Sequence, residues 1–80
     1  MWTKTVFCKI KGFPLQPVQV WLDDTDQEGR EVVKIQAMMN ELYITETVLF
    51  GDREAVYDYI KHYSKDAGES FLERHRSEFE

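Results

Sequence analysis

The sequence has little of what usually reinforces a small fold. It contains one cysteine, Cys8, and two histidines, His62 and His75, among 80 residues. A single cysteine cannot form an intrachain disulfide, and two histidines without neighbouring cysteines do not make a structural zinc site. Because small domains have small cores, they often gain stability from disulfides, metals or self-association. Of these three, the sequence leaves only self-association open.

Long apolar runs are also missing. No stretch approaches the roughly 18 apolar residues of a membrane span, and residues 1–11 lack the apolar region of a secretory signal. Aromatic residues make up 14% of the chain, which argues against disorder because disordered segments are poor in aromatics. We therefore expect one domain, residues 1–80, that is soluble and cytoplasmic and does not bind a membrane.

Positive charge is scarce. The net charge is −5, and a basic excess occurs only in residues 1–22, which hold lysines and no acid. Nucleic-acid binding needs clustered Lys and Arg that neutralise phosphates. A sheet face with aromatics is typical of some RNA-binding domains, but the charge argues against a nucleic acid as the partner.

Catalytic and cofactor motifs are absent from the sequence. It has no glycine-rich phosphate loop and no Ser/His/Asp or Cys/His arrangement that could be nominated as a catalytic site. Cys8 falls on the predicted buried face of a strand, where cysteine behaves as a small hydrophobe. We interpret His62 as a helix-surface residue and His75 as a residue near the apolar stripe. We therefore predict a non-enzymatic protein with no catalytic residues, no metal and no cofactor.

Apolar and polar residues alternate with the period of a β-strand in four segments: 3–11, 18–23, 31–39 and 42–50. Turn-forming residues separate these segments, and short sequential connections predict an antiparallel meander. Within the fourth segment, Glu46 falls on the otherwise apolar face. This break in the pattern indicates a bulge or an early strand end near Thr45.

The period becomes helical from Asp52, a good N-cap residue. The helical pattern continues to Phe79, as one long helix or as two helices. Residues 66–70 favour a break, with Ser70 capping the second helix. The predicted fold class is α+β: a four-stranded antiparallel β-meander followed by one long or two short C-terminal helices packed on one sheet face.

The predicted core joins one face of the sheet to one face of the first helix. The sheet residues on that face are Val6, Cys8, Ile10, Val18, Val20, Leu22, Val33, Ile35, Ala37, Leu42 and Ile44. The helix residues that face them are Val56, Tyr59, Ile60 and Tyr63.

The opposite sheet face carries large apolar residues among polar ones: Phe7, Trp21, Val32, Met38 and Tyr43. A solvated sheet face should be mostly polar, and aromatic residues and Met are enriched in interface cores. Three occupants remain open for this face. It could pack against a second copy in a homodimer, against a different protein, or under the C-terminal segment that contains Phe71, Leu72 and Phe79.

Acidic residues cluster at the turn after the second strand: Asp23, Asp24, Asp26, Glu28 and Glu31. Residues 24–29 resemble the opening of an EF-hand calcium loop, but the twelfth position holds Ile35 where that loop needs a glutamate. We therefore predict no calcium site. Two interpretations remain: a solvated hairpin tip, or a negative lobe that speeds association with a basic partner surface.

These features favour a small acidic binding or regulatory protein that acts by occupying a surface of a macromolecular partner. Accessory and inhibitory proteins of bacteria and phages offer an analogy for this class. The alternative is a small-ligand-binding domain, with a pocket between sheet and helix lined by Trp2, Tyr59 and Tyr63.

Overall fold

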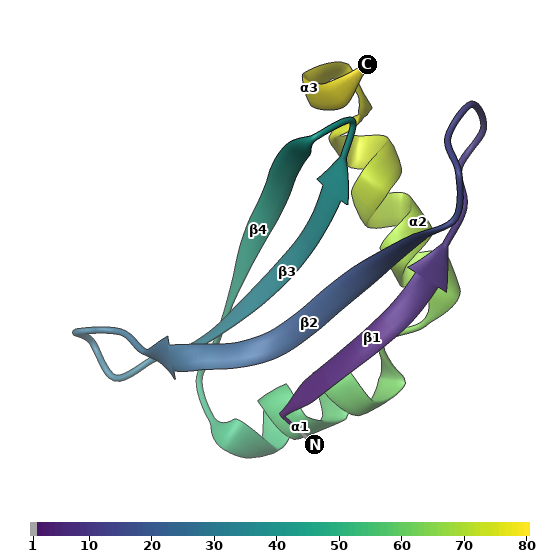
Figure 1. Cartoon of the computed structure of the whole chain (residues 1–80). Coiled ribbons are helices and arrows are strands. Elements are labelled where there is room, and N and C mark those ends of the chain that lie inside the picture. The colour runs from purple at the N-terminus through teal and green to yellow at the C-terminus, as the bar shows by residue number, and fades with distance from the viewer. Residues whose placement is uncertain (1) are drawn as a thin grey trace.

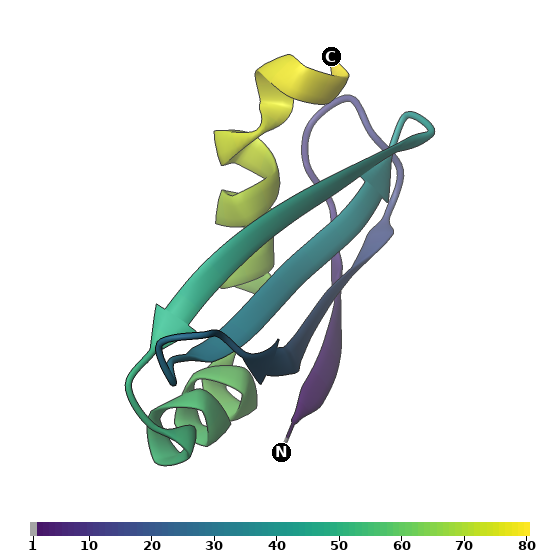
Figure 2. The ribbon, with the colours of Figure 1, turned by 90° about the vertical axis from the view of Figure 1, so that its left-hand side faces the viewer.

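The computed structural model describes residues 2–80, which form one open sheet with helices on a single face (Figures 1 and 2). The strands are β1 (Thr3–Cys8), β2 (Gln16–Thr25), β3 (Glu31–Met39) and β4 (Leu42–Phe50). Each strand pairs antiparallel with the next in the order β1-β2-β3-β4. The predicted α+β meander is therefore confirmed.

The connections explain where the first two strands differ from prediction. Strand β1 ends at Cys8 because a turn follows, in which the Phe13 amide donates to the Ile10 carbonyl over 3.2 Å. Strand β2 begins earlier than predicted and includes Pro17, which lies opposite Phe7. The β3–β4 hairpin turns through Asn40 and Glu41, both with positive φ, as tight two-residue hairpin turns require.

Strand β4 contains no bulge. It pairs with β3 continuously from Phe50 to Leu42, so the predicted irregularity near Thr45 was wrong. Glu46 does face the helices, and it is accommodated there because Arg74 and His75 bind its carboxylate. The sheet's bulge lies instead in β2, where the register shifts between Leu22 and Asp24.

The C-terminal third forms α1 (Arg53–His62), α2 (Lys65–Arg74) and the short α3 (Arg76–Phe79). Asp52 caps α1, accepting a hydrogen bond from the Ala55 amide over 2.8 Å. A division into separate helices is confirmed, but its predicted position was wrong. Helix α1 ends at His62, with Tyr63 as its C-cap residue. The Ser64 hydroxyl then caps α2, so Ser70 lies within that helix.

The core lies between the sheet and the helices, with α1 across one end of the sheet and α2 against β1 (Figure 1). Phe71, Leu72 and Phe79 are buried in this core, so the C-terminal segment does not cover the opposite face. Leu42, predicted in the core, is half exposed at the start of edge strand β4, while neighbouring Met39 is buried. Among residues 2–80, no helix is long and apolar enough to cross a membrane.

Candidate interaction surface

The sheet face away from the helices, here called the open face, has no helix over it (Figure 2). At one end of this face, Phe7 lies opposite Pro17 and Met38 opposite Tyr43. The exposed fractions are 58% for Phe7, 45% for Met38 and 67% for Tyr43. We call these four residues the aromatic end.

The next row across the open face is polar and uncharged. It contains Thr5, Gln19, Gln36 and Thr45, which the strand register places side by side. The Gln36 amide donates to the Thr45 hydroxyl over 3.1 Å. This polar row therefore partly satisfies its own hydrogen bonds.

Beyond the polar row, a second apolar group contains Trp21, Val32 and Leu49. Leu49 is exposed and lies opposite Val32, while Trp21 and Val32 are only partly exposed. The predicted surface is thus divided: Phe7, Met38 and Tyr43 lie at one end of the sheet, with Pro17 between Phe7 and the other two, whereas Trp21 and Val32 lie past the polar row. Sequence reasoning missed Leu49, although its alternation with Tyr43 along β4 places it on the same face.

Charge is sparse on the open face. Among the described residues, the charged side chains on this face are Lys34, Asp24, which the register pairs with Val32, and Asp23 beside it at the bulge, although charged residues make up 31% of the chain. Lys34 donates to the Thr47 hydroxyl over 2.8 Å, and Asp23 accepts a hydrogen bond from the Trp21 indole. Depletion of charge together with exposed aromatics and Met is the composition of an interface core.

The acidic turn is held together by Asp26. Its carboxylate accepts hydrogen bonds from the backbone amides of Glu28 and Arg30, over 3.0 and 2.8 Å, and pairs with the Arg30 guanidinium at 2.7 Å. The backbone hydrogen bond from Arg30 lowers the pKa of Asp26, with the Arg30 side chain and the Glu28 amide acting in the same direction. Arg30 also pairs with Glu28, so part of the negative charge is neutralised locally.

Glu31 does not lie with the other acids at the exposed tip. It is 9% exposed, on the same face as Val33, because β3 alternates from its first residue. Its carboxylate pairs with the Arg53 side chain at 3.1 Å and accepts from the Thr25 hydroxyl over 3.2 Å. The exposed acidic group therefore consists of Asp23, Asp24 and Glu28.

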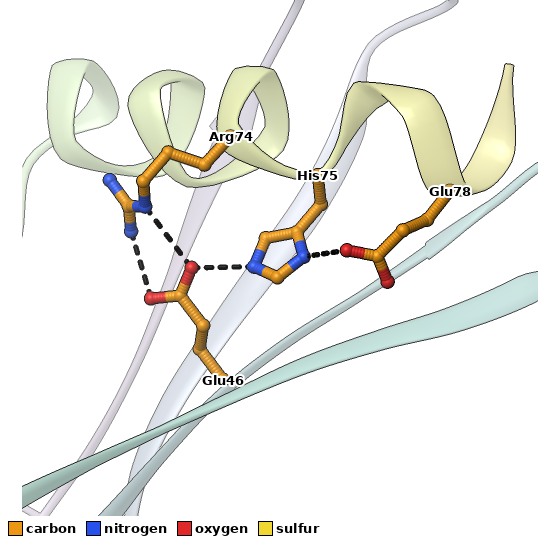
Figure 3. Close-up of polar contacts among 4 residues, drawn as sticks. All are labelled: Glu46, Arg74, His75 and Glu78. Atoms are coloured by element: carbon orange, nitrogen blue, oxygen red, sulfur yellow. Dashed lines mark hydrogen bonds and ion pairs between the residues drawn. The ribbon is translucent and has the colours of Figure 1, made fainter.

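A cluster of charged residues that the sequence did not reveal ties the C-terminal helices to β4 (Figure 3). Arg74 binds both oxygens of Glu46, over 2.9 and 3.1 Å. His75 contacts Glu46 through Nε2 at 2.6 Å and Glu78 through Nδ1. Two ring nitrogens that both face carboxylates favour a doubly protonated imidazole.

The pKa values in this cluster follow from its contacts. Burial alone would lower the pKa of His75, but its hydrogen bonds to Glu78 and Glu46 raise it above the ordinary value of 6.5. The hydrogen bond from Arg74 is the largest influence on Glu46 and, with the contact to His75, lowers the pKa of that carboxyl. Local sequence patterns could not identify the partners of Glu46, because these partners lie far away along the chain.

The three residues proposed to line a ligand pocket do not come together. Tyr59 and Tyr63 are neighbours, with ring centroids 5.7 Å apart, whereas Trp2 packs on Tyr57 at 5.9 Å. Two hollows lie largely on the open face instead, and Gln19 and Gln36 line both of them. Within residues 2–80, no group of three His, Cys, Asp or Glu residues is arranged to hold a metal ion.

Comparisons with known proteins identify no relative. No protein-family model matches this sequence, and neither a curated protein nor a solved structure shows significant similarity to it. The functional argument therefore rests on the chain's own geometry.

Proposed function

We propose that the protein is a non-enzymatic binding protein that acts by covering a surface of a macromolecular partner with its open face. The aromatic end is the observation that carries this proposal. Phe7 pairs with Pro17 and Met38 pairs with Tyr43 at the same end of the sheet, and Phe7, Met38 and Tyr43 are each exposed to about half or more. Exposed apolar groups gathered in one place mark interaction sites more often than scattered ones.

Two properties of the open face favour its burial against a partner: exposed apolar area and a rigid backbone. Burying apolar surface contributes roughly 25 cal/mol per Å², and aromatic side chains bury much area with few rotatable bonds. The backbone beneath them is already fixed by β-pairing. Little conformational entropy is therefore lost on binding.

The acidic group contributes to the proposed function through its field. Asp23, Asp24 and Glu28 are exposed near one hairpin tip, where negative charge would speed association with a basic partner surface. Asp24→Asn combined with Glu28→Gln tests this while leaving Asp26 to hold the turn. We expect a lower association rate at low salt and little change at high salt; equal rates at low salt would remove the steering role.

The test of the proposed function uses tagged protein as bait in an extract of cells that produce it, with chemical cross-linking and mass spectrometry. We expect Phe7→Ala/Tyr43→Ala to lose the captured macromolecule. The matched control is Leu15→Ala/Tyr57→Ala, which removes two exposed side chains outside the aromatic end. Equal capture by the wild type and both variants, each folded by circular dichroism, would refute a role for the open face.

A further inference from the structure

We infer that the open face also binds a second copy of this chain, packed face to face about a twofold axis that runs along the strands between β2 and β3. The inference rests on the proposed function only in taking the open face as a binding surface. It adds the identity of one occupant and the orientation in which that occupant binds.

Charge selects this face for self-association. Each copy carries a net charge of −5, so two copies repel each other across most surfaces. The open face is where this repulsion is smallest, because its charged side chains among the described residues are Lys34 and, at one end, Asp23 and Asp24. A second acidic copy can therefore approach this face without placing carboxylates against carboxylates.

The strand order makes the open face self-complementary. A twofold axis between β2 and β3 places β1 over β4 of the second copy, and β2 over its β3. Each row then meets the same row, so Phe7 faces Tyr43 of the second copy. Aromatic pairs of this kind add to the gain from burial.

The inner strands match in the same way. Gln19 faces Gln36 of the second copy, and amides can both donate and accept hydrogen bonds. Lys34 faces Trp21 of the second copy, where an ammonium group over an indole ring is attractive. No lysine faces a lysine in this arrangement.

A twofold axis running across the strands fits less well. It would place Gln36 over Lys34 and Gln19 over Trp21 of the second copy. It would also move Phe7 away from Tyr43 of the second copy, to the end of β1 that begins at Thr3. The aromatic end would lose its best contact, so the axis along the strands is favoured.

The area of the face suits a reversible dimer. Strands of nine or ten residues and four-strand spacing give a face of roughly 30 by 19 Å, or about 600 Å² per copy. Stable interfaces bury roughly 600–1,000 Å² per partner. Because the face is at the lower end of this range, we expect self-association in the micromolar range, and the second copy would compete with a macromolecular partner for the same face.

Cross-linking of purified protein tests the orientation. Thr5→Cys/Thr45→Cys places cysteines that face each other across the inferred interface. Within one chain they are three strand spacings apart, roughly 14 Å, so a short bismaleimide should link copies. Thr45→Cys/Thr47→Cys is the matched control, because those positions meet only with the axis across the strands. Wild-type Cys8 is buried and should not link.

Sedimentation equilibrium tests whether the open face forms the dimer interface. We expect a dimer at micromolar concentration and at least a 30-fold weaker association for Phe7→Ala/Tyr43→Ala, as for interface hot spots. Thr45→Arg, a single exposed change, repeats the test should the double variant fail to fold. A dimer unaffected by these changes, or linked only through positions 45 and 47, would overturn the inference. A strict monomer would also overturn it, whereas Phe7-dependent capture from extract would still support the proposed function.

Discussion

Gly68 in α2 lies directly against the Sγ of Cys8 in β1. A Cβ at position 68 would overlap that sulfur and approach Val6 Cγ2 to 3.2 Å. The helix can therefore come this close to the strand only where it has no side chain. Gly68 lies within residues 66–70, where the sequence favoured a helix break, but in the structure it is a packing residue inside α2.

Replacing Gly68 should be destabilising, against the usual trend. Gly→Ala within a helix normally raises stability by about 1 kcal/mol. Here the added methyl group would overpack the contact with Cys8 and should lower stability by about 1–3 kcal/mol instead. Urea denaturation measures the difference, with Gly51→Ala as the control because a Cβ there meets nothing. Cys8→Ala should relieve part of the cost in the double variant, and an additive double-mutant cycle would contradict the contact.

Tyr63→Phe should leave stability unchanged or raise it by about 1 kcal/mol. The Tyr63 hydroxyl is buried and makes no hydrogen bond, and burial raises the pKa of that phenol. Removing an unsatisfied buried group removes its desolvation cost. Chemical denaturation checks this, and a loss of more than 1 kcal/mol would show that the hydroxyl has a partner.

Stability should depend on pH through the Glu46–His75 contact. The pKa of His75 is raised in the folded state. Its contribution to the free energy of unfolding is therefore complete below about pH 6.5 and is lost as pH rises through the folded-state pKa. The pKa of Glu46 is lowered in the folded state. Its contribution to the free energy of unfolding is therefore complete above about pH 4.5 and is lost as pH falls through the folded-state pKa. The cluster is therefore strongest between these two values.

His75→Gln should remove the alkaline part of this dependence and cost about 1 kcal/mol at pH 5.5, since the contact is partly exposed. Urea denaturation between pH 4 and 9 measures both effects. His62→Gln is the control, because His62 is exposed and its ring hydrogen-bonds to the Asp58 carbonyl of its own helix. The same pH profile for His75→Gln and the wild type would rule out the imidazole as the cause.

Two glutamates of the acidic segment should differ in their effect on stability. Glu31→Ala should cost about 1–2 kcal/mol, because it leaves the Thr25 hydroxyl without its acceptor and Arg53 without its buried carboxylate. Glu28→Ala should change stability by less than about 0.5 kcal/mol, since its pairing with Arg30 is solvent-exposed. Thermal unfolding of both variants checks this, and equal losses would contradict the assigned burial.

Local patterns were sufficient to predict the strands and the fold class. Alternation along β3, for example, placed Val33, Ile35 and Ala37 in the core, where the structure has them. The exact helix break was harder to predict, because Ser64 and Ser70 are both good capping residues. In the structure Ser64 is the cap, and Gly68 packs on β1 from within α2.

The exceptions to the pattern depend on contacts distant in sequence. Glu46 interrupted the alternation of β4, and a bulge was the local explanation; the actual one is its pairing with Arg74 and His75. The division of the open face was missed for a similar reason. Alternation assigns residues to a face, but only the strand register determines which of them are neighbours.

The order of the elements affects how the chain can fold as it is synthesised. Each hairpin of the meander joins neighbours in sequence, so the sheet can pair early. Phe71, Leu72 and Phe79 are synthesised last, yet they belong to the same buried core as Cys8 and Val18 from the first two strands. A ribosome-bound chain that stops before residue 65 would therefore expose the apolar side of its sheet to chaperones, and should become resistant to protease only after α2 has emerged.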